Sequence, residues 1–469
     1  RPEQASMIVL PLENLSPDPD NAFFADGLTD ELIAALSKVR ALRVISRTSA
    51  MLFKGARKSV PAIAQEVSVR YVLEGTVRRA GNHVRITAQL IDGPTDVHLW
   101  AERYTGALED IFELQERLAR QIVEAVQVEL TPQEAARLGE RPIRNPAAYE
   151  CYLKARHEIL RMSPESHEQA LRLAREGLAI VGENELLYYT MGHVYANQSV
   201  WGLLSPDAAH ALIAECVGKI LMLNRDSARG HALLGMMQYQ AGKRVESARA
   251  FRRSLELEPN DPDVLTWLIS LYVRAGKSAP ARPLVDRLSA IDPLTPLNRT
   301  WPAWFDLFDG KPPGEFLAAA RRLMEADPAS HFACWLTLWA LSFTGRLREE
   351  GDPILDRLMQ EGPDTPFGQW AAVLKAALEG NRDAALQAVT PGLLSWARSD
   401  DIGSLAVAGC YAVLHMQDEV LAWLANAIAV GSTSYPLVTK NPYLMQVLRG
   451  PRAEEFLDRF RVLWETQEL

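Results

Sequence analysis

Residues 234–259, with the sequence LGMMQYQAGKRVESARAFRRSLELEP, decide the fold of most of the chain. Leu234 and Gly235 lie in a first helical segment, Gly242 marks a turn, and a second segment rich in small residues ends at Pro259. The same frame returns 34 residues later, with Leu268, Tyr272, Gly276, Ala281 and Pro293 at matching positions. A period of this length, with matching residue types, predicts a stack of helix pairs in which glycine frees each turn and proline ends the second helix.

Further copies extend the pattern in both directions. Turn glycines recur at a spacing of 35, at Gly310, Gly345 and Gly380, and earlier copies begin near Tyr152 and Met191. These positions match those of the tetratricopeptide repeat, so we expect an all-α tetratricopeptide solenoid over residues 147–436. Residues 437–469 break the pattern and are predicted to form C-terminal capping helices.

The first 132 residues have a different pattern. Met7–Leu12 and Leu42–Ser46 are short apolar runs that predict buried strands, and a helix is expected after Asp26. Three stretches with a period of two then predict strands over Tyr71–Arg79, His83–Asp92 and His98–Tyr104, followed by a long amphipathic helix from Leu108. We expect an α/β domain with a mixed sheet over residues 1–132. Residues 133–146 are predicted to be a linker, with the α/β domain and the repeats forming separate cores.

Composition restricts the function. The 469 residues carry a net charge of −9, which argues against a chain whose main role is nucleic-acid binding, and no nucleic acid is expected to bind directly. The four cysteines are far apart, so neither a zinc site nor a disulfide framework is predicted. No catalytic motif is complete: Gly276-Lys277-Ser278 lacks the first glycine of a phosphate loop, and no histidine pair has zinc spacing. We therefore expect no enzyme activity, no cofactor and no metal within this chain.

The N-terminal segment also carries a family likeness. Its motifs resemble the TolB-N-terminal-like (FlgO-like) domain of bacteria: VLPLENLS (9–16), FADGLT (24–29), ISRTS (45–49), FKG (53–55), LEGTVR (73–78), QLID (89–92) and LWAERY (99–104). The resemblance implies an α/β domain followed by tetratricopeptide repeats. It also implies an output module fused N-terminally: a class III adenylate cyclase, a serine/threonine kinase or a winged-helix regulator of the CadC type. We interpret the chain as a portion of such a longer protein.

The concave groove of the repeats is the first candidate site. Positions 2, 5, 9 and 12 of each first helix line the groove of such a solenoid. They predict a partner-binding groove formed by Tyr189, His193, Arg229, Met236, Tyr239, Asp263, Thr266 and Ser270. The Lys/Asn/Arg set with which some of these proteins grip a terminal carboxylate is missing, so a chaperone-tail clamp is disfavoured. A helix or extended peptide remains the expected partner, and the alternative is an array that only spaces domains or forms a homodimer.

A basic stretch is the second candidate site. Residues 32–65 contain no acid, and they predict a docking patch formed by Arg43, Arg47, Lys54, Arg57 and Lys58. Such a patch suits a phosphate, an anionic lipid surface or an acidic partner. The alternative is that these side chains pair with acids of the same chain.

Two functions follow from these observations. The first is a non-catalytic regulatory, sensory and protein-interaction module of a bacterial signalling protein, with a peptide or protein in the repeat groove. The second is a receptor for a small anionic ligand, held in the α/β domain or at its seam with the repeats, that controls the fused output module. Four unpaired thiols favour the cytoplasm, whereas a membrane segment before Arg1 would place the chain on the extracytoplasmic face.

Overall fold

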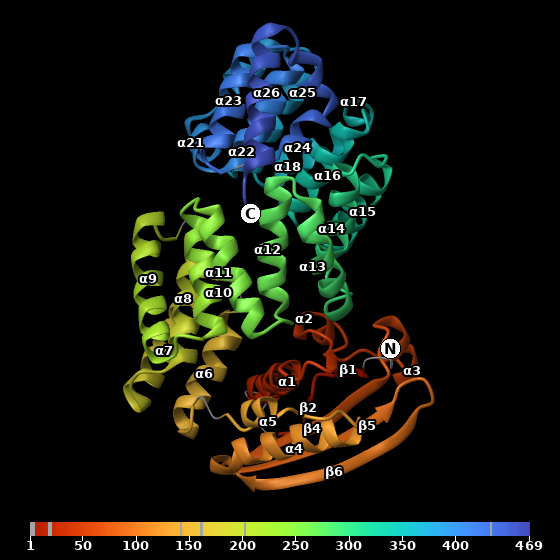
Figure 1. The fold of residues 1–469 in the computed structure, drawn as a ribbon, viewed down its shortest axis with the longest axis vertical. Helices are drawn as coiled ribbons and strands as arrows, with labels where there is room; N and C mark the ends of the chain where they lie inside the picture. The colour runs from red at the N-terminus through yellow and green to blue at the C-terminus, as the bar shows by residue number, and fades with distance from the viewer. Residues whose placement is uncertain (1–4, 17–20, 141–142, 160–162, 201–202, 432–433) are drawn as a thin grey trace. The chain divides into compact units, whose positions relative to one another are not determined.

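The computed structural model describes residues 5–16, 21–140, 143–159, 163–200, 203–431 and 434–469. It has an N-terminal mixed sheet with helices and a C-terminal array of helix pairs, as the sequence predicts (Figure 1). The chain divides into two compact units. The first contains residues 1–241, 246–267 and 287–295, and the second contains residues 242–245, 268–286 and 296–469.

The sheet of the first unit combines parallel and antiparallel strands. Its strands in the described residues are β1 (Ala5–Val9), β2 (Glu13–Asn14), β3 (Leu42–Val44), β4 (Tyr71–Ala80), β5 (His83–Asp92) and β6 (Val97–Ala107). Their order is β3-β1-β4-β5-β6, and β2 pairs with β4. The two neighbours of β1 run parallel to it, whereas β4, β5 and β6 form the antiparallel meander predicted from the period of two (Figure 1).

Helices close this sheet and continue into the repeats. They are α1 (Ala22–Ser37), α2 (Arg47–Met51), α3 (Val60–Glu66), α4 (Ile111–Ala125) and α5 (Pro132–Leu138). Alternate residues of β5, such as Ile86 and Leu90, are fully buried, because a strand half covered by helices buries one face. The segment expected to be a linker contains α5, whose Glu134 accepts a hydrogen bond from the Arg40 backbone N–H at 2.9 Å.

The helix pairs follow without a second sheet in the described part of the array. Their helices are α6 (Pro146–Ile159), α7 (Pro164–Val181), α8 (Glu185–Val200), α9 (Pro206–Leu223), α10 (Ala228–Gln240), α11 (Arg244–Leu257), α12 (Pro262–Ala275), α13 (Ser278–Ile291), α14 (Trp301–Phe308), α15 (Gly314–Ala326), α16 (His331–Phe343), α17 (Leu347–Glu350), α18 (Asp352–Glu361), α19 (Pro366–Leu378), α20 (Arg382–Gln387), α21 (Pro391–Ser399), α22 (Asp401–Val413), α23 (Gln417–Ala429), α24 (Tyr435–Thr439), α25 (Pro442–Val447) and α26 (Pro451–Thr466).

The turns confirm the repeat register. The five predicted turn glycines all have positive φ: 72° at Gly242, 65° at Gly276, 85° at Gly310, 73° at Gly345 and 78° at Gly380. This left-handed conformation is the one that favours glycine. The same conformation recurs one period later at His415, with φ of 57°, between α22 and α23. The array therefore has a further repeat whose turn carries no glycine.

One hydrophobic core joins the sheet to the first repeats. The buried residues of the sheet belong to the same hydrophobic core as Tyr149, Tyr152 and Leu153 of α6 and Leu187 of α8. The α1 and α6 helices meet closely at Gly27, where an added Cβ would lie 2.7 Å from Leu153. The separate cores expected from the sequence are therefore not seen in the first unit, and the exact domain boundaries stay a prediction.

Candidate functional site

The predicted groove faces a cavity in the first unit. The cavity has a volume of about 490 Å³, and α6, α8, α10 and the start of α12 form one wall of it. Residues of α1 and of the β3–α2 region also line it. We call this cavity the groove chamber and define it by Asp30, Arg47, Tyr152, Arg156, Tyr189, His193, Arg229, Met236, Glu258, Asp261, Asp263 and Trp267.

Five of the eight predicted groove residues line this chamber: Tyr189, His193, Arg229, Met236 and Asp263. Tyr239 lies nearby, with its ring 5.0 Å from the Trp267 ring in an edge-to-face arrangement. Thr266 donates its hydroxyl hydrogen to the Pro262 carbonyl at 2.8 Å, so it is engaged with its own helix. Ser270 lies further along α12, in the second unit.

A charge triad closes the side of the chamber formed by α1. Asp30 is buried and forms ion pairs with Arg47 of α2 and with Arg156 of α6, the latter at 3.2 Å. Burial raises the pKa of Asp30, although Arg156 and Arg47 oppose that shift. Asp30 offsets one of the two positive charges, so the triad as a whole keeps a net charge of +1.

Arg229 differs from these two arginines because no described residue forms a hydrogen bond or ion pair with its side chain. Its guanidinium makes no hydrogen bond or ion pair with any residue that the structure describes. Burial by itself would lower the pKa of Arg229, but the charge of Glu258 and the nearby Tyr152 raise it overall. The guanidinium is therefore a permanently charged group with five free donors on the chamber wall.

Carboxylates gather where α12 begins. Asp261 caps this helix, because its Oδ1 accepts the backbone N–H of Asp263 at 3.0 Å and that of Val264 at 3.1 Å. Burial and then the charge of Asp263 raise the pKa of Asp261 to about 7. Glu258 lines the chamber beside them and raises this pKa further, whereas Arg229 lowers it. The chamber thus has a group of carboxylates at the start of α12, within electrostatic reach of Arg229.

Two aromatic side chains of α8, Tyr189 and His193, also line the chamber. The Tyr189 and His193 rings are 5.9 Å apart on α8. Burial and the charges of Asp261 and Asp263 raise the pKa of Tyr189, so its phenol stays protonated. Burial lowers the pKa of His193 despite the opposing charge of Asp263, so its imidazole is neutral at neutral pH. Both rings offer hydrogen-bonding groups without adding charge.

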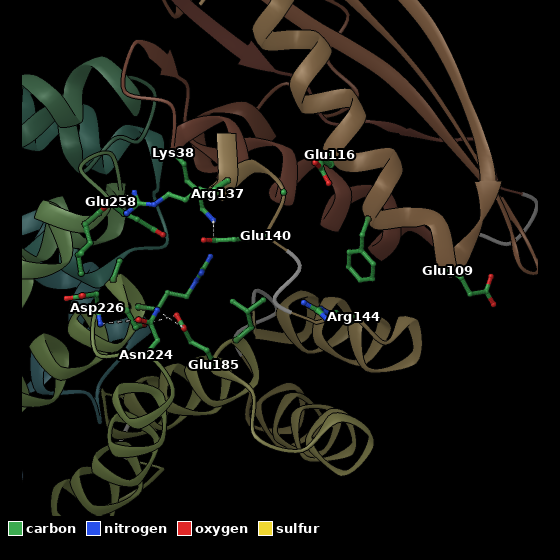
Figure 2. A pocket seen from close by; sticks show the side chains of 18 residues that line it. Lys38, Glu109, Glu116, Arg137, Glu140, Arg144, Glu185, Asn224, Asp226 and Glu258 are labelled. Atoms are coloured by element: carbon green, nitrogen blue, oxygen red, sulfur yellow. Dashed lines mark hydrogen bonds and ion pairs between the residues drawn. The ribbon is translucent and has the colours of Figure 1, made fainter. Parts of the chain in front are cut away.

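A second cavity adjoins the chamber. It has a volume of about 950 Å³, and Figure 2 shows its polar side chains. Lys38 pairs with Glu140 at 3.3 Å, and the Ser227 hydroxyl donates to Glu185 at 2.7 Å. Lys38, Arg229 and Glu258 line both cavities. The Arg229 side chain therefore borders both cavities.

Most of the predicted basic patch is engaged within the chain. Arg43 donates to the backbone carbonyl of Ala290 at 2.7 Å, and Arg47 pairs with Asp30. Lys54 pairs with Asp26 at 2.6 Å, and Lys58 pairs with Glu66 at 2.6 Å. Arg57 is exposed and has no such partner among the described residues. Fewer positive charges are therefore available for docking than the sequence indicates, because four of the five side chains have partners within the chain. The docking patch stays a prediction.

The ISRTS motif ties the α/β part to the repeats. Ser46 and Ser49 each donate a hydroxyl hydrogen to Asp292 Oδ1 at 2.6 Å. Ser49 Oγ also accepts the Leu294 backbone N–H at 3.0 Å. All these residues belong to the first unit and are buried or half-buried. This motif therefore holds the chamber wall in place.

Sequence reasoning missed six residues of the chamber: Asp30, Tyr152, Arg156, Glu258, Asp261 and Trp267. Trp267 is at position 6 of its helix, and Asp261 and Glu258 precede the helix, so a search of positions 2, 5, 9 and 12 passes over them. The Asp261-Pro262 pair is a helix-start signal that points to the carboxylates at the start of α12.

Two features are absent from the described ranges. No helix there is both long and apolar enough to cross a membrane. Within the same ranges, His, Cys, Asp and Glu side chains form no cluster of three or more suited to a metal ion.

Comparison with known proteins gives different results for the two parts of the chain. Residues 3–121 match the family described as "HilA/YgeH-like transcriptional regulator, second domain". The comparisons do not confirm the resemblance to the TolB-N-terminal-like domain.

A curated relative from Rhizobium meliloti (strain 1021), described as "Putative adenylate cyclase 3", is 45% identical over 179 residues. The match covers 38% of this chain and 30% of that protein, so the chain spans less than a third of the relative's length.

Solved structures with similar helical arrays include a tetratricopeptide repeat protein from Parabacteroides merdae. It is 10% identical, covers 61% of this chain and 100% of its own, and has a TM-score of 0.37. Yeast Tom70 is 14% identical, covers 68% of this chain and 65% of its own, and has a TM-score of 0.38. The repeat assignment rests on the periodic turns of this chain and needs no support from these scores.

Proposed function

We propose that this chain is a non-catalytic regulatory and protein-interaction module of a bacterial signalling protein, and that its repeat groove binds a peptide or protein partner. The gathering of Tyr189, His193, Arg229, Met236 and Asp263 around one cavity carries this proposal. Concave, partly apolar walls with a few convergent polar groups are typical of binding sites.

The similarity to the Rhizobium meliloti protein supports a signalling role. That protein's name refers to an adenylate cyclase, and this chain matches less than a third of it. We infer that an output module, either a cyclase, a kinase or a DNA-binding domain, is fused to this chain. The chain would then regulate that module by binding and not by chemistry of its own.

A receptor for a small ligand is the second candidate. The unsatisfied guanidinium of Arg229 favours it, because an arginine held on a cavity wall is suited to a carboxylate or phosphate. The α1 side of the chamber also restricts the room for a long helix. A volume of about 490 Å³ falls within the range of small-molecule sites.

In-cell photocrosslinking tests the partner-binding proposal. A photoreactive residue at Asp263, an exposed position on the chamber rim, should give a discrete adduct with a partner in cells that express the natural full-length protein. The matched control is Met222, which is 83% exposed on α9 and lies outside the chamber. The adduct at Asp263 should disappear when Tyr189 is changed to Ala.

The same adducts from both positions, or an adduct that persists in Tyr189→Ala, would count against a partner in the groove. A partner that binds elsewhere would give neither the positional contrast nor the loss.

A further inference from the structure

The groove chamber contains charges of both signs that the protein leaves unsatisfied. Arg229 contributes a guanidinium without a hydrogen-bond partner in the described chain, and the Glu258 carboxylate likewise has none within bonding distance. Arg229 and Glu258, both described residues, act on each other electrostatically without forming an ion pair. Each therefore keeps its donors or acceptors available to a bound molecule.

The opposite charges converge on one point of the chamber wall. Asp261, Asp263, Arg229 and Arg156 all act electrostatically on the Tyr189 hydroxyl. That hydroxyl makes no hydrogen bond to the described residues. A ligand beside Tyr189 would therefore be within electrostatic reach of both guanidinium groups and carboxylates.

This mixture of charges excludes simple ions. A phosphate ester or dicarboxylate would be repelled by Glu258, Asp261 and Asp263, and a polyamine would be repelled by Arg229 and the Arg156 side of the triad. A molecule with one positive and one negative end satisfies both sides. Trp267 and Met236 supply an apolar wall for the rest of such a molecule.

We propose that the groove chamber binds a small zwitterion, namely an amino acid or a short peptide with both ends free. Its carboxylate would bind to Arg229 and the Tyr189 hydroxyl, and its ammonium group would bind to the carboxylates at the start of α12. This proposal deepens the proposed function, because it names the class of occupant for the same groove.

Protonation provides an independent signature. Asp261 is partly protonated near neutral pH, because burial and Asp263 raise its pKa to about 7. An ammonium group beside it would lower that pKa and release a proton on binding. Titration calorimetry at pH 7 in two buffers of different ionisation enthalpy measures this release directly.

The main test is calorimetric binding to the full chain. The probes are the twenty amino acids, alanine peptides of two to four residues, and the same peptides with an acetylated amino end or an amidated carboxyl end. We expect at least one zwitterion to bind with proton release, and blocking either end should weaken binding at least tenfold. The length series separates a free amino acid from a short peptide as the source.

Two variants assign the ends. Arg229→Gln should abolish the preference for a free carboxylate, and Asp263→Asn should weaken the preference for a free amine. The matched controls are Arg225→Gln and Asp207→Asn, at exposed positions outside the chamber. Melting curves of all four variants show whether each remains folded, and the blocked peptides on the unaltered protein give a result that needs no variant.

Several results would overturn the proposal. One is the absence of binding by every probe at millimolar concentration. Another is equal binding of the free peptides and the peptides blocked at either end, and a third is equal loss of binding in Arg229→Gln and Arg225→Gln. If no zwitterion binds but the crosslink from Asp263 forms and is lost in Tyr189→Ala, only the zwitterion proposal fails. If a zwitterion binds and no partner is crosslinked, the partner-binding proposal fails instead.

Discussion

Replacing Gly235 with leucine tests the repeat packing at its tightest point. A Cβ at this position would lie 2.5 Å from Cδ1 and Cε1 of Phe251, which is fully buried. The Phe251 ring cannot easily move, because it stacks on Trp267 with centroids 6.4 Å apart and an interplanar angle of 15°. The Ser247 hydroxyl also donates to the Gly235 carbonyl at 2.8 Å and fixes the helix.

These contacts determine how much Gly235→Leu changes the free energy of unfolding. Overpacking a rigid site costs about 3 kcal/mol, at the upper end of the usual range, and leucine regains about 0.8 kcal/mol of helix propensity over glycine. We therefore expect Gly235→Leu to lower the free energy of unfolding by about 2 kcal/mol. Gly218 is the matched control, since it is an exposed helical glycine of α9 with no atom within 4 Å of its added Cβ. Gly218→Leu should gain about 0.8 kcal/mol.

Urea titration followed by circular dichroism measures both variants, and hydrogen exchange shows where the loss occurs. We expect faster exchange in α10 and α11 and little change in β4–β6, because each repeat contacts only its neighbours. If Gly235→Leu is as stable as the unaltered chain, the packing described at Phe251 is wrong. If exchange instead becomes faster evenly over the whole first unit, the destabilisation is not confined to neighbouring repeats, and the expectation of local contacts is wrong.

Three further predictions follow from single residues. Between pH 3.8 and about 7 the folded chain holds more protons at Asp261 than the unfolded chain, so stability falls as pH rises through this window. Asp261→Asn keeps a helix cap and should flatten this dependence in melting curves, gaining stability at pH 8 and little at pH 4. His415→Gly should raise the free energy of unfolding by about 1 kcal/mol in urea titration, since it relieves a left-handed backbone at an exposed position, and an unchanged midpoint would contradict this. Tyr239→Ala should cost about 1 kcal/mol in the same assay by removing the ring contact with Trp267, and a neutral result would show that the contact does not contribute.

The sequence predicts the repeat array well because its signals are local. A turn glycine and the small residue at Gly235 each report on their own helix pair, and the structure places them as expected. The turn at His415 is not predicted in this way, because a residue other than glycine adopts the left-handed conformation there. Its repeat position predicts that Tyr239 faces a partner in the groove, and the structure adds a ring contact with Trp267 that the sequence does not predict.

The chamber is harder to predict because its walls are distant in sequence. The groove side follows from repeat positions, but nothing in the period shows that Asp30 and Arg47 line the same cavity as Tyr189. The partners of the basic stretch are hidden from the sequence for a related reason. Charge in a sequence does not reveal its partners, and Arg47 pairs with an acid of the preceding helix.

The hydrogen bonds from Ser46 and Ser49 to Asp292 have a consequence for biosynthesis. Ser46 precedes its acceptor by 246 residues, and residues 287–295 are the last part of the first unit to be made. At a translation rate of about 5 to 20 residues per second, the ribosome delivers Asp292 roughly 12 to 49 s after Ser46. During that interval the nascent α/β part has both hydroxyls and the neighbouring β3 edge without their final partners. Vectorial synthesis therefore leaves this surface open to chaperones, and to premature pairing, until the fourth helix pair has emerged.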